Sequence, residues 1–465
     1  MDNESKKRFY FIAAGGVGMS ALAKFLAEKG YEVSGSDISD GKYVKMLRNM
    51  GISVITGHDP SRIQPGMTVV LSTAVKDDDP ELLRAKELNL EIMHRSDVLA
   101  FISKDFSENE NSIFFGFSGT HGKTTTSGLC SYVLNKAGLH PSYAVGGFIP
   151  GIDNNAEFDG EKYFCAELDE SDGTIVKYSP DINVINNLSF DHPDFYVNGM
   201  DDIYKTFKTY VDGLKPSAKI LVNIDCPGIR EFLKYIPGKN TVTFGLEDGD
   251  YRAENIEQKG FSSSFDILKN NELLTRFTIS IPGKHNIYNA LAVFAALKEA
   301  GLSPEKFAAE FKSFSGMGRR FQIAANFNGI TVIDDYAHHP EEILATLDGL
   351  SGLSARKIAI FQPHRYSRFN SLYKDFLNVF EGVDKVIVTD IYAASEQPPE
   401  NSLTPEDFVK DVNCMESVYL KGSPEQIAPR IYEMLKPGDV VVTLGAGTVT
   451  KLGKLLEEAS RTVKA

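Results

Sequence analysis

The sequence predicts an α/β protein that is built from three domains. The chain has 465 residues, which is more than one hydrophobic core usually holds, and this length favours roughly three domains. Short apolar runs alternate with amphipathic segments along the whole chain, a pattern typical of parallel sheets covered by helices. Glycine-rich turns follow the strand-like runs 9–14 and 113–115, and each turn opens a helical pattern.

Composition excludes several classes of protein. Hydrophobic residues make up 42% and charged residues 24% of the chain, as in ordinary globular proteins. The net charge of −14 argues against a nucleic-acid partner. No apolar run approaches the ~20 residues of a membrane span, and the polar N-terminus leads directly into a strand, so neither membrane insertion nor a signal peptide is expected. The four cysteines lack metal-ligand spacing and are expected to be thiols in the reducing cytoplasm.

The first expected domain begins with a strand, a glycine-rich turn and a helix. The turn is Gly15-Gly16-Val17-Gly18, a helix is expected over 19–29, and the next strand, 31–35, ends at Ser36-Asp37. This pattern is close to a dinucleotide-binding fingerprint, although Ala13 occupies its first glycine position. It favours a diphosphate at the helix N-terminus, and a tight turn without a ligand is the alternative.

The same domain offers a further candidate ligand-binding residue at a strand end. Strands are expected at 68–72 and 91–93, with a helix at 80–88 between them, and Arg95 follows the second strand. Ligands of α/β sheets lie beyond the carboxyl ends of strands, so Arg95 could contact a phosphate. A solvated arginine is the alternative. The polar stretch 104–111 predicts a linker.

A second glycine-rich turn predicts a phosphate-binding loop at the start of the central domain. Between strand 113–115 and a helical pattern lies Gly116-Phe117-Ser118-Gly119-Thr120-His121-Gly122-Lys123-Thr124-Thr125-Thr126. Glycines let backbone N–H groups face a polyphosphate, and the helix N-terminus adds partial positive charge. Lys123 would reach the β- and γ-phosphates, and the Thr124 hydroxyl would ligate Mg²⁺. The usual spacing of this loop would place a glycine at Phe117, so the general pattern is incomplete.

Carboxylates and a histidine at the next strand ends are candidate metal ligands. Strand 163–167 ends at Glu167, with Asp169 and Glu170 just behind it. An acid at a strand end beside a phosphate loop commonly supplies a second ligand to Mg²⁺, and an acidic helix cap is the alternative. Strand 182–188 leads to His192, although a single histidine is more often structural.

The rest of the central domain includes two candidate adenine contacts. A helix at 200–213, a strand at 218–223 and a β-rich piece over 241–281 are expected before a helix at 290–300. Asn286 and Asn289 lie one helical turn apart, so both could face an adenine edge. A simple N-cap is the alternative for Asn286.

A third domain is predicted after the glycine-containing segment 313–320, which we interpret as a hinge. Strands are expected at 331–334, 357–361, 385–390 and 440–444, and helices at 340–350, 370–380, 423–435 and 448–459. Two polar clusters follow strands, namely Asp334-Asp335-Tyr336-Ala337-His338-His339-Pro340 and Gln362-Pro363-His364-Arg365-Tyr366-Ser367-Arg368. Packing does not need three histidines and two arginines there, whereas a carboxylate-bearing, phosphorylated substrate does.

Taken together, these motifs resemble the Mur ligase family over nearly the whole chain. Besides the two glycine-rich turns and the two polar clusters, the resemblance rests on Ser34-Gly35-Ser36-Asp37, Asp169-Glu170-Ser171-Asp172, Gly283-Lys284-His285-Asn286 and Gly318-Arg319-Arg320-Phe321. The family's own form of the phosphate loop has the short Gly-x-x-Gly-Lys-Thr spacing, which accounts for the misfit at Phe117.

The resemblance implies a Rossmann-like N-terminal domain for a UDP-sugar, a central P-loop ATPase-type α/β domain and a C-terminal Rossmann-like α/β domain for an amino acid. We place their boundaries at 1–106, 107–316 and 317–465. The family roles map onto this chain as follows: ATP on Gly119, Thr120, His121, Gly122, Lys123, Thr124, Thr125, Asn286, Asn289, Arg320 and Asp334; Mg²⁺ on Thr124, Glu167 and His192; the UDP-sugar or the reacting centre on Gly15, Gly16, Val17, Gly18, Ser36, Asp37, Arg95 and Tyr336; catalysis by Lys123, His338, His364, Arg365 and Arg368.

The chain departs from the family pattern in a few places. Ala13 and Ala337 each replace a glycine by one methyl group, which puts loop geometry in question but not function. Pro193 stands where the family often has methionine. Phe207 occupies the position at which several sibling ligases carry a carbamylated lysine, so that modification is not predicted here.

The implied reaction activates an acid with ATP. ATP would phosphorylate the lactyl carboxylate of UDP-N-acetylmuramate, and the amine of L-alanine would attack the acyl phosphate, with His338 or His364 accepting its proton. A recycling ligase that adds a tripeptide to the same sugar is the nearest alternative. A NAD-dependent oxidoreductase and a non-catalytic nucleotide sensor are the alternatives from other classes. We expect a monomer or a weak homodimer.

Overall fold

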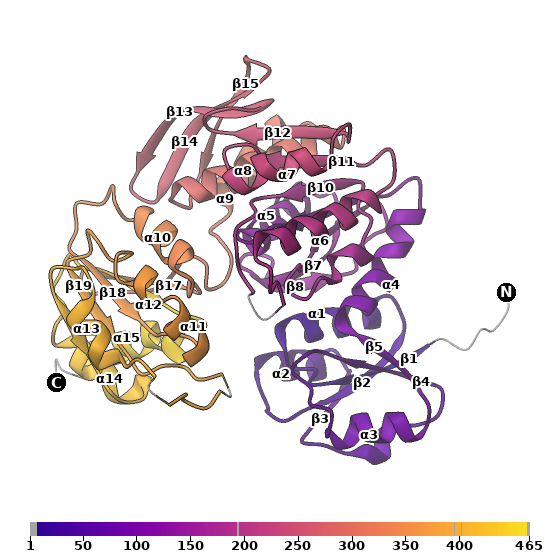
Figure 1. Cartoon of the computed structure of the whole chain (residues 1–465), viewed down its shortest axis with the longest axis horizontal. Coiled ribbons are helices and arrows are strands. Elements are labelled where there is room, and N and C mark those ends of the chain that lie inside the picture. Colours follow the sequence, from indigo (N-terminus) through magenta and orange to yellow (C-terminus); the bar gives the residue numbers. More distant parts are fainter. Residues whose placement is uncertain (1–6, 193–194, 395, 401, 463–465) are drawn as a thin grey trace. The chain divides into compact units, whose positions relative to one another are not determined.

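The computed structural model describes residues 7–192, 195–394, 396–400 and 402–462. The chain forms two compact units (Figure 1). The first comprises Met1–Glu254, Asp266–Phe277 and Tyr288–Phe314, and the second comprises Asn255–Phe265, Thr278–Ile287 and Ser315–Ala465. Among the described residues, no helix is long and apolar enough to cross a membrane.

The first unit begins with a five-stranded parallel sheet in the order β3-β2-β1-β4-β5. Its strands are β1 (Arg8–Ile12), β2 (Glu32–Asp37), β3 (Ser53–Thr56), β4 (Met67–Leu71) and β5 (Glu91–His94), and its helices are α1 (Val17–Glu28), α2 (Lys42–Asn49), α3 (Pro80–Glu87), α4 (Arg95–Glu108) and the 3₁₀ turn η1 (Pro60–Arg62). This strand order, outward in both directions from β1, is that of a Rossmann-like sheet. The linker predicted over 104–111 is wrong as far as Glu108, because α4 continues through it. The apolar residues Val98, Ile102 and Phe106 keep that helix on the core.

A larger sheet follows in the order β15-β14-β13-β12-β11-β10-β6-β9-β7-β8. Its strands are β6 (Ile113–Ser118), β7 (Ser142–Ile149), β8 (Asn154–Glu157), β9 (Tyr163–Glu167), β10 (Ile182–Ile185), β11 (Lys219–Asn223), β12 (Thr241–Gly245), β13 (Tyr251–Lys259), β14 (Ser262–Lys269) and β15 (Glu272–Ile279). Its helices are α5 (Lys123–Lys136), α6 (Met200–Asp212), α7 (Pro227–Phe232), α8 (Lys284–Glu299) and α9 (Ala308–Ser313), with 3₁₀ turns η2 (Thr174–Lys177), η3 (Leu233–Tyr235) and η4 (Pro304–Phe307). The neighbouring strands β10, β6 and β9 are parallel, so their carboxyl ends meet at one edge.

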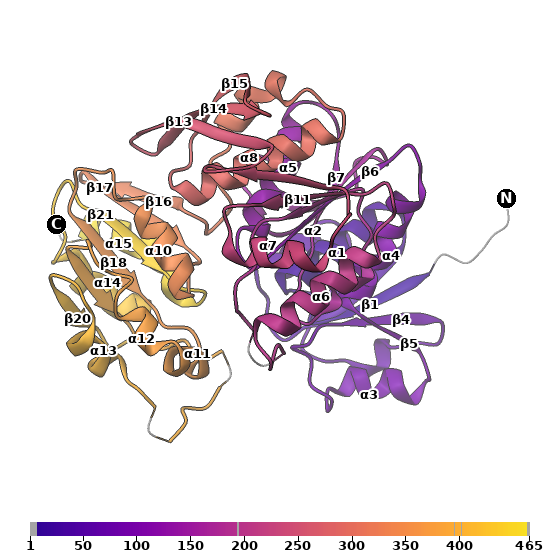
Figure 2. The ribbon, with the colours of Figure 1, turned by 45° about the horizontal axis from the view of Figure 1, so that its top comes forward.

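Alternation along β9 shows how this sheet is covered on both faces. Phe164 packs against Phe25 of α1 and stacks on Phe106 of α4. The next residue, Cys165, faces the other way, and its Sγ lies 3.6 Å from Sγ of Cys130 on α5. Successive side chains of a strand point to opposite faces. Therefore α5 covers one face of the central sheet, whereas the N-terminal domain packs through α1 and α4 on the other. Figure 2 shows α6 and α7 beside β11, and Phe207 and Phe232 of these helices belong to the same core cluster as Val222 of that strand.

The second unit contains a six-stranded sheet in the order β16-β17-β21-β18-β19-β20. Its elements are β16 (Gln322–Phe327), β17 (Ile330–Asp335), α10 (Pro340–Asp348), β18 (Lys357–Phe361), α11 (Tyr366–Ser371), α12 (Tyr373–Phe376), β19 (Lys385–Val388), α13 (Pro405–Asp411), β20 (Ser417–Tyr419), α14 (Pro424–Tyr432), β21 (Val440–Leu444), the 3₁₀ turn η5 (Thr448–Lys451) and α15 (Leu452–Thr462). All neighbouring pairs are parallel except β16 with β17. The three-domain α/β fold expected from the sequence is confirmed.

Three helix predictions differ from the structure. The helix expected at 448–459 begins as the 3₁₀ turn η5, and α15 follows only from Leu452. The helix expected at 370–380 is instead the short pair α11 and α12, which meet at Leu372. The Ser371 hydroxyl donates to the carbonyl of Arg368 at 3.1 Å, a local bond that competes with continuing the helix. The helix expected at 290–300 begins at Lys284, so Asn286 and Asn289 lie within α8 and not before it.

Phe164 gives a test of this packing. Replacing a fully buried aromatic side chain by alanine removes apolar contacts and leaves a cavity, which costs about 3–5 kcal/mol. We therefore expect Phe164→Ala to lower the unfolding midpoint in urea, followed by circular dichroism. Leu273→Ala is the control, because Leu273 is 64% exposed and its loss should leave the midpoint nearly unchanged. Equal midpoints for both variants would contradict the packing described for β9.

Candidate active site

The predicted phosphate loop joins β6 to α5 and depends on two glycines. Gly119 has φ +114° and Gly122, the residue before α5, has φ +84°. A Cβ on Gly119 would lie 2.7 Å from the carbonyl oxygen of Asn187, and one on Gly122 would lie 2.8 Å from Oδ1 of Asn289. Larger side chains are therefore excluded by both conformation and space. The amides of the first turn of α5 have no acceptor within the helix and are oriented to bind an anion.

Two asparagines after β10 hold this loop in place. The Asn187 side chain accepts from the amide of His121 at 2.8 Å and donates to its carbonyl at 3.0 Å. Thr120 donates its amide to the Asn187 carbonyl, and its hydroxyl bonds Ser189. The Asn186 amide donates to the Thr126 hydroxyl at 2.8 Å. No role for this pair was predicted, because the strand was expected over 182–188, whereas β10 ends at Ile185 and leaves both asparagines past the strand end.

Lys123 folds back across the loop. Its ammonium group donates to the carbonyls of Gly119 and Thr120 at 2.7 and 3.0 Å and to Oε1 of Glu170 at 2.8 Å. Burial alone would lower the pKa of Lys123, but Glu170, Asp169 and Glu167 together raise it above its ordinary value. The ammonium is therefore charged and surrounded by acceptors at the mouth of the loop.

The two predicted metal ligands Thr124 and Glu167 lie side by side. The Thr124 hydroxyl donates to Oε1 of Glu167 at 2.9 Å, and Oε2 accepts from the amide of Gly146 at 2.7 Å. A hydroxyl and a carboxylate oxygen at hydrogen-bond distance are the hard oxygen donors that Mg²⁺ prefers. His192, the third predicted ligand, follows β10 with φ +57°, and its ring Nε2 is 3.6 Å from a carboxylate oxygen of Asp191. Pro193 lies outside the described residues.

The predicted adenine contacts lie on the first turns of α8. Asn289 accepts from the Thr126 hydroxyl at 3.2 Å, so it lies beside the phosphate loop. Asn286 donates its side-chain amide to the carbonyl of Pro282 at 2.7 Å. That bond differs from the N-cap alternative, in which the side-chain oxygen would accept a backbone amide.

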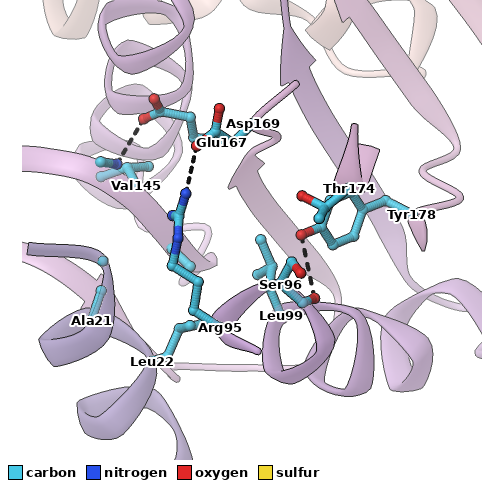
Figure 3. Close-up of a pocket in the computed structure, with 13 residues that line it drawn as sticks. Ala21, Leu22, Arg95, Ser96, Leu99, Val145, Glu167, Asp169, Thr174 and Tyr178 are labelled. Atoms are coloured by element: carbon cyan, nitrogen blue, oxygen red, sulfur yellow. Dashed lines mark hydrogen bonds and ion pairs between the residues drawn. The ribbon is translucent and has the colours of Figure 1, made fainter. Parts of the chain in front are cut away.

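A pocket of about 90 Å³ lies between the N-terminal and central domains of the first unit (Figure 3). Gly18 of α1 and Arg95 of α4 line it from one side, and Glu167 and Asp169 line it from the other. Figure 3 shows Arg95 reaching from α4 to Asp169, and this ion pair measures 2.6 Å. Burial would raise the pKa of Asp169, but Lys123 and Arg95 outweigh it and hold that pKa well below its usual range. The pocket thus brings predicted sugar-binding and metal-binding residues together.

The first glycine-rich turn packs against its predicted acid. The amide of Gly15 donates to Oδ2 of Asp37 at 2.8 Å, and a Cβ on Gly15 would lie 2.7 Å from the same oxygen. Ser36 is buried and donates to Glu81, while Gly16 and Val17 begin α1. Ala13 has φ +60°, a conformation that costs a non-glycine residue about 1–2 kcal/mol. This strain explains why glycine suits the position, and the turn still forms with alanine.

In the second unit, the two predicted polar clusters form a stack of rings. His338 lies edge-on to Tyr336 and to His364, with ring centroids 5.2 and 5.4 Å apart. His364 stacks on Tyr392 at 5.7 Å, and its Nδ1 is 3.1 Å from the guanidinium of Arg368. Burial, the neighbouring His338 and the arginines lower the pKa of His364 to about 3. Burial likewise lowers the pKa of His338. Both rings are therefore neutral near pH 7.

Tyr392 is a site residue that the sequence analysis missed. Its carbonyl accepts from the amide of Arg365 and its amide donates to the carbonyl of Pro363, both at 2.8 Å. Between these bonds Arg365 adopts φ +64° and ψ 138°, which a side chain disfavours. The loop after β18 is thus fixed on Tyr392 in a strained conformation. Residues after β19 were a usable signal, because β18 and β19 are parallel neighbours.

Arg320 and Asp334 have their described partners within the second unit. Arg320 lies over the ring of Tyr336 at 5.0 Å and 3.5 Å from Glu342. Asp334 accepts from the hydroxyls of Thr443 and Thr450, each at 2.6 Å, and so ties β17 to the turn after β21.

Comparison with known proteins identifies the family. Three family models match, described as "Mur ligase family, catalytic domain" at 8–107, "Mur ligase middle domain" at 117–297 and "Mur ligase, glutamate ligase domain" at 319–447. A UDP-N-acetylmuramate–L-alanine ligase of Dictyoglomus turgidum is 38% identical over 97% of this chain and 96% of that protein. The chain belongs to the Mur ligase family. The enzyme of the same name from Carboxydothermus hydrogenoformans is 39% identical over 97% of this Mur ligase and 96% of its own length.

A solved structure agrees with this assignment. The UDP-N-acetylmuramate–alanine ligase of Thermotoga maritima matches this Mur ligase with a TM-score of 0.81 and 26% identity. The match covers 98% of this chain and 99% of that one. The similarity therefore extends over all three sheets.

The conformation of Gly119 in the predicted phosphate loop of this Mur ligase can be tested by nucleotide binding. In Gly119→Ala, the new methyl group meets the Asn187 backbone and the positive φ becomes strained, so nucleotide affinity should fall at least about 100-fold. Gly138→Ala, at φ +71° with no atom within 4 Å of its new Cβ, is the matched control and should bind normally. Calorimetric titration with ATP measures both. Unchanged affinity in Gly119→Ala would disprove the geometry of the cradle.

The lowered pKa of His364 predicts that the stability of the protein depends on pH. The pKa of His364 is about 3 in the folded protein and about 6.5 in an unfolded chain, so the unfolded state binds more protons between these values. The contribution of His364 to stability is thus present above about pH 6.5 and declines on acidification towards pH 3. We expect the thermal unfolding midpoint of His364→Asn to fall less between pH 7 and about 4.5 than that of the wild type. His140→Asn, at an exposed histidine, should follow the wild type, and parallel curves for all three proteins would refute the shift.

Proposed function

We propose that this Mur ligase uses ATP to join L-alanine to the lactyl carboxylate of UDP-N-acetylmuramate, in the synthesis of peptidoglycan precursors. The observation that carries this proposal is the pocket at which Arg95 and Gly18 meet Glu167, one hydrogen bond from Thr124 of the phosphate loop. The relatives that are 38% and 39% identical are named for this activity, and the matches cover 96% of each of them.

The chemistry requires the carboxylate to be activated, because a carboxylate is a poor electrophile. Transfer of the terminal phosphoryl group of ATP to an oxygen of this carboxylate gives an acyl phosphate, in which phosphate is a good leaving group. Catalysis of such transfers depends mainly on positioning and on charge neutralisation. We propose that residues 119–125 hold the phosphates. The nucleotide site would be completed by Asn286, Asn289, Arg320 and Asp334. Lys123 would offset the negative charge of the phosphoryl group during its transfer. Arg95, with the turn 15–18 and Ser36 and Asp37, would hold the UDP-sugar.

Magnesium fits the residues that are present. Thr124 and Glu167 offer adjacent oxygen donors, and His192 follows the neighbouring strand β10. We propose that Thr124 and Glu167 hold one Mg²⁺ and His192 a second. The ions would neutralise phosphate charge and orient the oxygens that exchange the phosphoryl group.

The third domain would complete the reaction. We propose that Tyr336 and Arg368 face the reacting centre. Arg365 would stabilise the tetrahedral intermediate formed when the amine attacks, or hold the acyl phosphate. Because the imidazoles of His338 and His364 are neutral near pH 7, either can accept the amine proton. The geometry of the ring stack favours no choice between them.

The alternative functions fare differently. The alternative prediction, a recycling ligase that adds a tripeptide, is wrong, since the full-length relatives reported above are named for L-alanine addition. An oxidoreductase built on the first βαβ unit would leave the Lys123 loop without a role. A non-catalytic sensor would not need the strained Arg365 beside two neutral histidines. We further propose a cytoplasmic location, consistent with four free thiols, a monomer or weak homodimer, and domain boundaries at 1–106, 107–316 and 317–465.

An assay tests this function. With ATP, Mg²⁺ and UDP-N-acetylmuramate, phosphate release should depend on added L-alanine. Lys123→Ala should lower kcat by at least about 1,000-fold while the protein stays folded, because the lost charge stabilises the transition state. Lys136→Ala, in the last turn of the same helix, is the control and should turn over normally. Phosphate release that ignores the amino acid, or an active Lys123→Ala enzyme, would contradict the proposal.

A further inference from the structure

The ring nitrogens of His338 and His364 have different hydrogen-bond partners, although both rings are neutral near pH 7. A neutral imidazole carries one proton, so one of its nitrogens donates and the other accepts. The partner of one nitrogen therefore decides which nitrogen holds the proton. The stacking of the rings favours neither histidine as the base, but these partners distinguish between them.

Both polar atoms beside Nδ1 of His338 are acceptors. The carbonyl oxygen of Tyr336 lies 2.9 Å from this nitrogen, and Oε2 of Glu342 lies 3.3 Å from it. That oxygen of Glu342 also accepts from the amide of His338 at 3.0 Å. Nδ1 of His338 therefore carries the proton, and Nε2 keeps its lone pair. Every hydrogen bond of His338 to a described residue involves its amide or Nδ1, so Nε2 is the nitrogen that can accept a proton.

His364 is held as the opposite tautomer. Its Nδ1 lies 3.1 Å from the guanidinium of Arg368, and a guanidinium can only donate. Nδ1 of His364 must accept this bond, so the single proton of the ring is on Nε2. The two rings lie 5.4 Å apart. At Nε2, His364 thus offers an N–H donor, whereas His338 offers a lone pair.

Glu342 is a carboxylate to which the reaction described above gives no role. It lies in the first turn of α10, its side chain is 14% exposed, and Oε2 accepts from the amides of His338 and His339 at 3.0 and 3.3 Å. Contacts of this kind form a capping box, which stabilises a helix N-terminus. The contact with Nδ1 of His338 is not needed for capping. A carboxylate at that nitrogen orients a catalytic imidazole and stabilises its protonated form.

We propose that Glu342 is a positioning residue, which keeps the proton of His338 on Nδ1 and thereby makes Nε2 of His338 the acceptor of the amine proton. His364 then serves as a hydrogen-bond donor and not as the base. The inference rests on the proposed attack of an amino acid on an acyl phosphate. Glu342 acts through His338 and does not touch the reacting atoms, whereas His338 is a catalytic residue.

The proton has a defined path in this reaction. The amine nitrogen uses its lone pair to bond the acyl carbon and becomes positively charged. One of its N–H bonds then breaks, and the proton moves to the lone pair on Nε2 of His338. The imidazolium keeps Nδ1–H directed at Glu342, whose negative charge stabilises it. The C–O bond to phosphate breaks, phosphate leaves with the electron pair, and His338 returns its proton to solvent.

Nitrogen NMR distinguishes the two tautomers directly. The full chain, labelled with ¹⁵N in its histidine rings, is measured without substrates at about pH 7.5, where both rings are neutral. The variants His338→Asn and His364→Asn assign the two sets of signals. We expect the proton on Nδ1 of His338 and on Nε2 of His364. A proton on Nε2 of His338 would overturn the inference, whether or not the enzyme is active.

Glu342→Gln separates capping from the effect of charge. Glutamine also serves in a capping box, so α10 keeps its N-terminus while the negative charge beside His338 is lost. At saturating ATP, we expect the single-turnover rate of amide formation to fall at least about 10-fold, with KM for L-alanine within about 2-fold of the wild-type value. Glu425→Gln is the matched control, because Glu425 also follows a proline in the first turn of a helix but its side chain is 53% exposed and pairs with Lys451. This control should keep the wild-type rate.

The outcomes separate this inference from the proposed function. A wild-type rate in Glu342→Gln would overturn the role of Glu342. If Glu342→Gln does not fold, the tautomers of the wild type decide. A wild-type protein without alanine-dependent phosphate release would instead overturn the proposed function.

Discussion

A buried ammonium group must have an anion beside it, and this requirement of Lys123 organises the centre of the molecule. Its side chain is 13% exposed and that of Glu170 is 4% exposed, so water screens neither charge well. In the structure that anion is the carboxylate of Glu170, 2.8 Å from the Lys123 ammonium. The second ion pair, Arg95 with Asp169, extends the same alternation of charge into the pocket between the N-terminal and central domains of the first unit.

Sheet topology explains why these charges meet. The order β10-β6-β9-β7 places four parallel neighbours together, and ligands bind beyond their carboxyl ends. The phosphate loop follows β6, Glu167 ends β9, Asn187 follows β10, and Gly146 near the end of β7 donates to Glu167. His121 and Asn187, which are 66 positions apart, thus meet because their strands are adjacent. The active-site charges depend on strand order more than on any local motif.

Much of this arrangement could be predicted from the sequence, because glycine turns and strand ends have local signatures. The loop 119–125 and the cluster around His364 followed from residue type at a strand end. The family resemblance selected Glu167 from three candidate carboxylates as the partner of Thr124. What could not be predicted depends on contacts between distant segments. Arg95 pairs with an acid 74 positions away, and Tyr392 stacks on His364 from a loop that shows no motif. Helix α4 was not predicted, because its polar end reads as a linker, although its buried face holds it on the core.

The central claim is that the Lys123 loop directs the terminal phosphoryl group of ATP onto a sugar-borne carboxylate. The most direct measurement follows an oxygen atom. UDP-N-acetylmuramate labelled with ¹⁸O in its lactyl carboxylate is turned over with ATP, Mg²⁺ and L-alanine, and the products are analysed by ³¹P NMR. The account predicts one labelled oxygen in each inorganic phosphate released, because the acyl phosphate breaks at its carbonyl carbon. Unlabelled phosphate, or label in AMP, would contradict it.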